Sequence, residues 1–229
     1  MLTFTKTGSY HNANKEACGD VVMTLCKDNR SLIVIADGVS SCRFGAEGAT
    51  IAAEAAMDFI LEHLEMDYLT PKVWGGMLLN HVLNTIMRFS AAQQQPSVEY
   101  SCTLLAVVMD REFGKLQFVN VGDGMLLGIR KESCPIIATP LFSSQGCPVI
   151  TTTGVNHIAQ FGSVPLKGIR GIVACSDGAW KRMYNREFLR AELRQLLIDG
   201  HYEAFLSFFD RTAGVDDCGI AIENIERVA

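Results

Sequence analysis

The chain lacks any long hydrophobic run. In its 229 residues the longest apolar stretches, such as residues 104–109, are far too short to span a bilayer, which takes about 20 residues. The start of the chain, with Thr3, Thr5 and Lys6, also lacks the apolar centre of a signal peptide. We therefore expect a cytoplasmic protein with no membrane segment.

Basic residues are not in excess either. Lys and Arg number 20 against 25 Asp and Glu, which gives a net charge of −5, and the basic residues are scattered along the chain. Because phosphate backbones are held by clustered Lys and Arg, we expect no nucleic-acid partner. An anionic substrate would need help from bound metal ions.

Several reactive motifs are missing as well. The eight cysteines form no C-x-x-C pair, and several lie in apolar strand-like runs, which is typical of small buried residues in a reducing cytosol. The C-x₅-R loop of cysteine phosphatases, the G-x-S-x-G elbow and the G-x-x-x-x-G-K-[ST] loop are all absent. A reaction on phosphate would therefore not use those sites.

What the chain does contain is a set of short acidic segments in a fixed order. Most follow or adjoin apolar runs, such as residues 32–36 and 171–175, which read as buried strands with carboxylates at their ends. Gathered carboxylates repel one another unless a cation lies between them, and oxygen ligands favour Mg²⁺ and Mn²⁺. The five segments are Gly19-Asp20, Ala36-Asp37-Gly38, Gly122-Asp123-Gly124, Ser176-Asp177-Gly178 and Asp216-Asp217.

The strand signals come in tightly joined groups. Strands at 101–109, 115–121 and 125–130 follow one another across short turns, so we expect an antiparallel meander with Gly122-Asp123-Gly124 as a hairpin turn. This argues against a doubly wound parallel sheet. The other expected strands are 2–7, 21–27, 32–36, 171–175 and 218–223, and the expected helices are 44–64, one that opens at Thr70-Pro71 and ends before Gln93, 186–198 and 202–212.

Together these elements predict an α+β fold, a four-layer α-β-β-α sandwich of two mainly antiparallel sheets flanked by helices. Residues 133–168 are expected to form weak strands and loops. No repeat or linker interrupts the chain, so residues 1–229 should form a single domain. In the helix capped by Thr70, the residues expected to face the core are Val73, Met77, Leu78, Val82, Ile86 and Phe89.

The order of these motifs resembles the metal-dependent protein phosphatases, the type 2C serine/threonine phosphatases, over nearly the whole chain. Each motif alone is a weak signal, but six of them in order at plausible spacing are a strong one. Residues 14–20 are similar to the first motif of the family, and Asp37-Gly38 to its D-G motif. The other matches are Ser101-Cys102-Thr103 with the G-S/T-T strand start, residues 121–125 with the G-D-S-R segment, residues 175–180 with the S-D-G segment, and residues 216–219 with the D-N/D-x-T ending.

The resemblance implies a role for most of the aspartates. Asp37 would bridge two metal ions, with the Gly38 carbonyl as a further ligand, and Asp177 and Asp216 would complete the first site. Asp123, together with Asp177, would hold a third and weaker ion that some members bind. The implied cofactors are thus two Mn²⁺ or Mg²⁺ ions, with a third in some members.

Two further aspartates lie beside these ligands. The resemblance implies that Asp20 acts on metal-bound water, directly or through a hydrogen bond, and that this water attacks phosphorus without a covalent phosphoenzyme. Asp217 stands where the family often has Asn, so Asp216 rather than Asp217 is the expected ligand.

Three positions depart from the family pattern. Lys15 stands where Arg is usual, and it can meet a substrate phosphate only as a point charge. Gly19 replaces a Glu that would bind the second metal, and Val39 replaces a His that many members use to protonate the leaving group. His11 and His157 are alternatives for this acid, although an isolated His is more often structural.

The main hypothesis is therefore a monomeric Mn²⁺- or Mg²⁺-dependent phosphatase that hydrolyses phosphoserine or phosphothreonine in a phosphoprotein, with a cognate serine/threonine kinase as a further partner. The alternative is a catalytically weak phosphatase-like module that binds a phosphoprotein or regulates a partner kinase, and Lys15 and Gly19 favour it. The retained aspartates favour the enzyme. A small-molecule phosphatase stays open, because metal chemistry does not specify what carries the phosphate.

Overall fold

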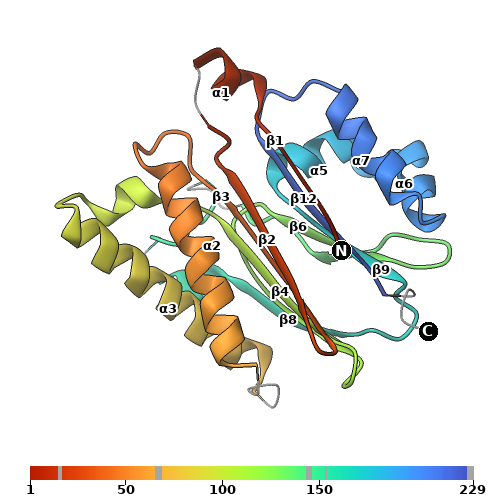
Figure 1. Ribbon diagram of the computed structural model, residues 1–229, viewed down its shortest axis with the longest axis horizontal. Coiled ribbons are helices and arrows are strands. Elements are labelled where there is room, and N and C mark those ends of the chain that lie inside the picture. Colours follow the sequence, from red (N-terminus) through yellow and green to blue (C-terminus); the bar gives the residue numbers. More distant parts are fainter. Residues whose placement is uncertain (15–16, 65–68, 143–145, 153, 226–229) are drawn as a thin grey trace.

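Two antiparallel sheets of five strands lie face to face, and each is covered on its outer side by helices (Figure 1). The computed structural model describes residues 1–14, 17–64, 69–142, 146–152 and 154–225. This arrangement confirms the expected α+β sandwich with its four α-β-β-α layers. Within those ranges, no helix is both long enough and apolar enough to cross a bilayer.

The first sheet contains the strand that leads into the candidate site. In β3 the side chains of residues 32–36 are all buried, because alternate side chains point to opposite faces of the sheet and both faces are covered. Leu32, Val34 and Ala36 pack toward the helices, whereas Ile33 and Ile35 pack toward the second sheet. The strands, in spatial order, are β2 (Asp20–Lys27), β3 (Arg30–Asp37), β4 (Leu104–Asp110), β5 (Lys115–Val121) and β8 (Gln160–Pro165).

Helices α2 (Gly45–Glu62) and α3 (Pro71–Ala92) cover the outer face of this sheet (Figure 1). Thr70 caps α3 as expected, since its side chain accepts a hydrogen bond from the Val73 amide. The predicted inward face is wrong at Val73 and Met77, whose exposed fractions are 48% and 38%. The buried face is rotated slightly around the helix and runs through Trp74, Gly75, Leu78, Leu79, Val82 and Ile86.

The second sheet carries its helices on the opposite side of the molecule (Figure 1). Its strands, in spatial order, are β1 (Leu2–Lys6), β12 (Cys218–Asn224), β9 (Gly171–Cys175), β6 (Met125–Ile129) and β7 (Ile136–Ala138). The covering helices are α5 (Asp177–Met183), α6 (Ala191–Ile198) and α7 (Tyr202–Arg211). Helix α5 is not among the expected elements, because seven residues are too few for a periodic pattern.

The helix expected at 186–198 is too long at its start. Arg186 has a backbone φ of +57°, which a helix cannot continue through, and the chain instead forms a small hairpin before α6. Its strands are β10 (Tyr184–Asn185) and β11 (Phe188–Leu189). The remaining short elements are α1 (Ser9–Asn14), η1 (Ser97–Tyr100) and α4 (Val155–Ile158).

The expected meander is wrong at its third strand. Strand β4 pairs with β5 as predicted, but β6 pairs with β9 and β7 in the other sheet. Gly122-Asp123-Gly124 is therefore a crossing between the two sheets rather than a hairpin turn. Gly122 has a φ of +110°, and a Cβ there would lie only 2.5 Å from the side chain of Thr103. Strand spacing cannot distinguish the two connections, because both are equally short.

Candidate metal centre

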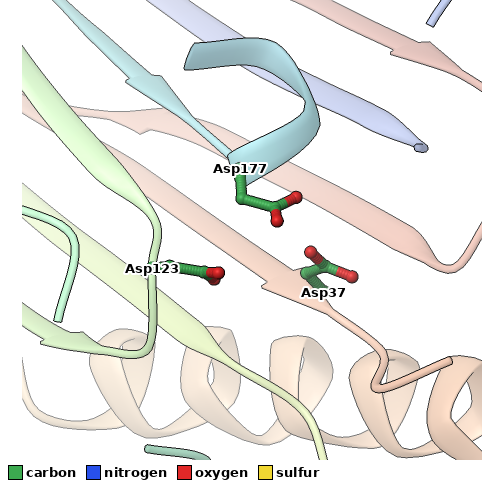
Figure 2. A group of neighbouring side chains, drawn as sticks. All are labelled: Asp37, Asp123 and Asp177. Atoms are coloured by element: carbon green, nitrogen blue, oxygen red, sulfur yellow. The ribbon is translucent and has the colours of Figure 1, made fainter. Parts of the chain in front are cut away.

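Three aspartates from three different elements converge at one end of the sandwich. Asp37 is the last residue of β3, Asp123 lies in the crossing between β5 and β6, and Asp177 is the first residue of α5. One carboxylate oxygen of each lies within 4.8 Å of those of the other two, and Figure 2 shows the side chains pointing toward one another. The structure thus brings together residues that are 140 positions apart in the chain, from Asp37 to Asp177.

The three carboxylates line an open pocket of about 380 Å³. Gly38 and Asp216, the other expected ligands, line the same pocket, and Asp216 is an exposed residue just before β12. A Cβ on Gly38 would collide with the backbone of Gly45, so this position next to Asp37 requires glycine. All the carboxylates assigned to metal ligation from the sequence therefore border one cavity.

Crowding makes the charged form of these groups costly. Burial raises the pKa of Asp37 well above its usual value, and the charges of neighbouring aspartates raise it further. Burial also raises the pKa values of Asp123 and Asp216, in each case with a contribution from the charge of Asp177. A divalent cation among these oxygens would offset both the burial and the repulsion, and hard oxygen donors suit Mg²⁺ and Mn²⁺.

Asp20 stands directly across from Asp37 in the pairing of β2 with β3. It is buried, and Ser176 Oγ donates a hydrogen bond to its Oδ2 at 2.5 Å. Burial is the main reason that the pKa of Asp20 rises to about 7. In the described part of the chain, Oδ1 of Asp20 and Oδ1 of Asp177 are buried and have no hydrogen-bond partner. Two orphaned carboxylate oxygens in one cluster fit a site made for cations.

Thr103 makes two hydrogen bonds with the backbone of Asp37, one as a donor and one as an acceptor. Its amide donates to the Asp37 carbonyl at 2.8 Å, and its Oγ1 accepts from the Asp37 amide at 3.2 Å. The side chain of Thr103 also fills the space beneath Gly122. Thr103, which lies just before β4, thus contacts both the end of β3 that carries Asp37 and the crossing that carries Asp123.

The crossing that carries Asp123 is held by two polar side chains. The indole nitrogen of Trp180 donates to the Asp123 carbonyl at 2.7 Å, and the amide of buried Asn120 donates to the carbonyls of Gly124 and Thr139, each at 3.0 Å. Trp180 is a residue type that favours the core, and it does pack on the core beneath α5. Its hydrogen bond gives it a positioning role that sequence reasoning missed.

Lys181 is a second residue that sequence reasoning missed. It lies one turn after Asp177 in α5, and its ammonium group hydrogen-bonds Asp177 Oδ2. Burial lowers the pKa of Lys181, but the bond and the charges of nearby aspartates outweigh it, so the pKa is raised overall. The spacing of Asp177 and Lys181 is a known signal for a helical ion pair, and it was hidden because α5 was not predicted.

Comparison with known proteins agrees with this geometry. The family profile described as Protein phosphatase 2C matches residues 7–211. The chain belongs to the protein phosphatase 2C family. No curated protein sequence gives a significant match.

Solved structures show how widely the protein phosphatase 2C fold is shared at low identity. A bacterial serine phosphatase is 15% identical with a TM-score of 0.71, and the match covers 98% of this chain and 96% of that one. The phosphatase Stp1 from Staphylococcus aureus is 14% identical with a TM-score of 0.71, covering 98% and 94%. RsbX in complex with magnesium is 12% identical with a TM-score of 0.64, covering 96% and 92%. At these identities the likeness concerns the fold.

The first motif is where this protein phosphatase 2C member differs from the family pattern. Lys15, the expected phosphate contact, and its neighbour Glu16 lie outside the described residues. Gly19 offers no carboxylate; its amide donates to Asp217 Oδ2, and its carbonyl accepts from the Gly38 amide at 3.2 Å. This segment is therefore tied to the site through its backbone.

Asp217 has a different environment from Asp216. It is buried and accepts hydrogen bonds from the amides of Gly8, at 2.6 Å, and Gly19. Its Oδ2 also lies 2.8 Å from Nδ1 of His11. Asp217 thus anchors the segment between β1 and β2, while Asp216 borders the pocket.

The two histidines considered as acids lie in different places. His11 borders a second hollow, which adjoins the pocket and shares Gly38 and Val39 with it. His157 lies in α4 and lines a groove beside the start of α3 instead. His11 therefore lies near the candidate site, and His157 lies in a different part of the molecule.

Proposed function

We propose that this protein is a metal-dependent phosphatase that hydrolyses phosphoserine or phosphothreonine in a phosphoprotein. The observation that carries the proposal is the convergence of Asp37, Asp123 and Asp177, with carboxylate oxygens within 4.8 Å of one another, in the lining of an open pocket. The serine and serine/threonine phosphatases of the same fold support the substrate class. In this proposal residues 1–229 act as one catalytic domain.

The donor set fits Mn²⁺ or Mg²⁺, because every side chain that would hold the ions offers oxygen. Asp37, Asp177 and Asp216, with the Gly38 carbonyl, would hold one ion, and Asp37 would also contact a second. When bound, the ions lower the pKa of water and neutralise charge on the phosphoryl oxygens.

The chain's own residues prepare the site for this chemistry. Thr103 fixes the position of Asp37, and Ser176 fixes Asp20 by its hydrogen bond to Oδ2. Oδ1 of Asp20 has no hydrogen-bond partner in the described residues, and we propose that it accepts a proton from the attacking water.

A second candidate is a weak phosphatase-like module that binds a phosphoprotein or regulates a partner kinase. Gly19 favours it, because no side chain at this position can bind the second ion. The buried and mutually repelling carboxylates favour the enzyme, since they are costly to keep in a pure binding module.

The test is hydrolysis of p-nitrophenyl phosphate and of a phosphothreonine peptide with added Mn²⁺. Wild type should be active, chelation should abolish the activity, and Asp37→Asn and Asp177→Asn should each lower it by roughly two orders of magnitude or more. Asp58→Asn, an exposed position in α2, is the matched control and should leave activity unchanged. A folded wild type that hydrolyses neither substrate would favour the binding module.

A further inference from the structure

The carboxylate cluster already contains one positive charge supplied by the protein. The ammonium group of Lys181 hydrogen-bonds Oδ2 of Asp177, while Oδ1 of Asp177 has no partner among the described residues. The two oxygens of Asp177 are thus used differently. One is committed to the ammonium group and the other is free for an ion.

The charge of Lys181 bears mainly on the outer side of the cluster. It lies among the main influences on Asp123 and on Asp216, where it favours the charged form. Burial and neighbouring carboxylates raise the pKa of Asp37, and the main influences on the pKa of Asp20 are burial and then the hydrogen bond from Ser176. The half-exposed side chain of Lys181 reaches the cluster at Asp177, and one carboxylate oxygen of Asp177 lies within 4.8 Å of one of Asp123.

We propose that the ammonium group of Lys181 takes the outer cation position beside Asp123 and Asp177, so that the site accepts two divalent ions and excludes a third. The inference rests on the proposed metal-dependent function. The ammonium group on Oδ2 of Asp177 repels a divalent ion at that oxygen and neutralises part of the charge there, whereas Oδ1 stays available to the ion of the first site. The charge of Asp123 is then balanced by the ammonium group of Lys181 instead of by a third ion.

The experiment counts Mn²⁺ ions bound per chain, by equilibrium dialysis and by the loss of the free-Mn²⁺ electron paramagnetic resonance signal. Wild type should bind two ions. Lys181→Met should bind three, and Lys181→Arg should still bind two, because it keeps the positive charge. Lys131→Met, an exposed lysine just beyond the far end of β6, removes the same charge elsewhere and should leave the count at two.

A double variant tests where the additional ion binds. Lys181→Met combined with Asp123→Asn should return the count from three to two, because the outer position needs both carboxylates. Lys181→Gln serves as a second variant if Lys181→Met melts at a lower temperature than wild type. Three ions in wild type, or an unchanged count in both Lys181→Met and Lys181→Gln, would overturn the inference while leaving the proposed function intact. A wild type that binds no Mn²⁺ and hydrolyses no phosphate would overturn both.

Discussion

Strand β3 has a buried acidic environment at each of its ends, and the two ends are neutralised in different ways. At the Ser31 end, Arg111 hydrogen-bonds Glu223 Oε1 and also donates to Ser31 Oγ at 2.9 Å. Ser31 in turn donates to Glu223 at 2.9 Å. At the Asp37 end the carboxylates face one another instead, and Lys181 is a partial counter-charge at their outer side.

The difference separates a structural ion pair from a site that needs an external ion. Glu223 has its counter-charge built into the sandwich, so its burial is compatible with stability at any metal concentration. Burial raises the pKa values of Asp37 and Asp20, and the charge of the carboxylate cluster is fully balanced only when cations enter the pocket. The change in stability caused by a substitution should therefore depend on metal at the Asp37 end of β3 and not at the Ser31 end.

The largest effect should follow from removal of the built-in cation. Arg111→Met removes the hydrogen-bonded counter-charge of buried Glu223 and leaves it the N-terminal ammonium group, 3.4 Å from Oε2, and the Ser31 hydroxyl. We expect a loss of about 3 kcal/mol in the free energy of unfolding. Urea denaturation should give the same loss with and without Mn²⁺. Arg130→Met, at an exposed position, is the control and should change stability little. Adding Glu223→Gln to Arg111→Met should recover part of the loss, and a loss that depends on Mn²⁺ would contradict the comparison.

The next effect concerns the external cation. With Mn²⁺ at about a hundred times its dissociation constant, wild type should gain about 2.7 kcal/mol in stability. Asp37→Asn should lose most of this gain, yet it should be more stable than wild type in chelator, because one repelling charge is gone. Thermal melts in EDTA and in Mn²⁺ measure both changes. A variant that is less stable than wild type under both conditions would show that Asp37 is structural.

The two ends of β3 also differ in how far the sequence could predict them. Asp37 ends an apolar strand and Asp177 follows another by two residues, and the sequence shows both strands clearly, so the meeting of these two residues could be predicted. The position of Asp123 in a crossing could not, because a two-sheet connection and a hairpin turn have the same length and composition. The pairing of Arg111 with Glu223 spans 112 positions and has no sequence motif, so only the packed sandwich reveals it. The ion pair between Lys181 and Asp177 could be predicted only from helix α5, and this helix is too short to give a periodic pattern in the sequence.

A third effect is a pH dependence found only in metal-free protein. The pKa of Asp20 is raised from 3.8 to about 7, mainly by burial. A raised pKa in the folded state means that stability is fully present below about pH 4 and is lost as the pH rises toward 7. The melting temperature of metal-free protein should therefore fall as the pH rises from 4 toward 7.

This dependence is measured as the melting temperature of wild type and Asp20→Asn in EDTA between pH 4 and pH 8. Asp20→Asn should show a flatter profile than wild type. Saturating Mn²⁺ should flatten the wild-type profile in the same way, because bound cations favour the charged carboxylates. Identical profiles for wild type and variant would exclude Asp20 as the cause.

The smallest effect tests a neutral contact at the site end. Trp180→Phe keeps an aromatic ring in the core beneath α5 but removes the hydrogen bond to the Asp123 carbonyl, which should cost about 1 kcal/mol in stability. The gain in melting temperature with Mn²⁺ should stay that of wild type, because in our proposal Asp123 is paired with Lys181 and contacts neither of the two ions. Trp74→Phe, the same change in a buried residue of α3, should also lower stability without changing that gain. A smaller Mn²⁺ gain in Trp180→Phe alone would mean that Asp123 contacts a bound ion, and it would contradict the assignment of Lys181 to the outer position.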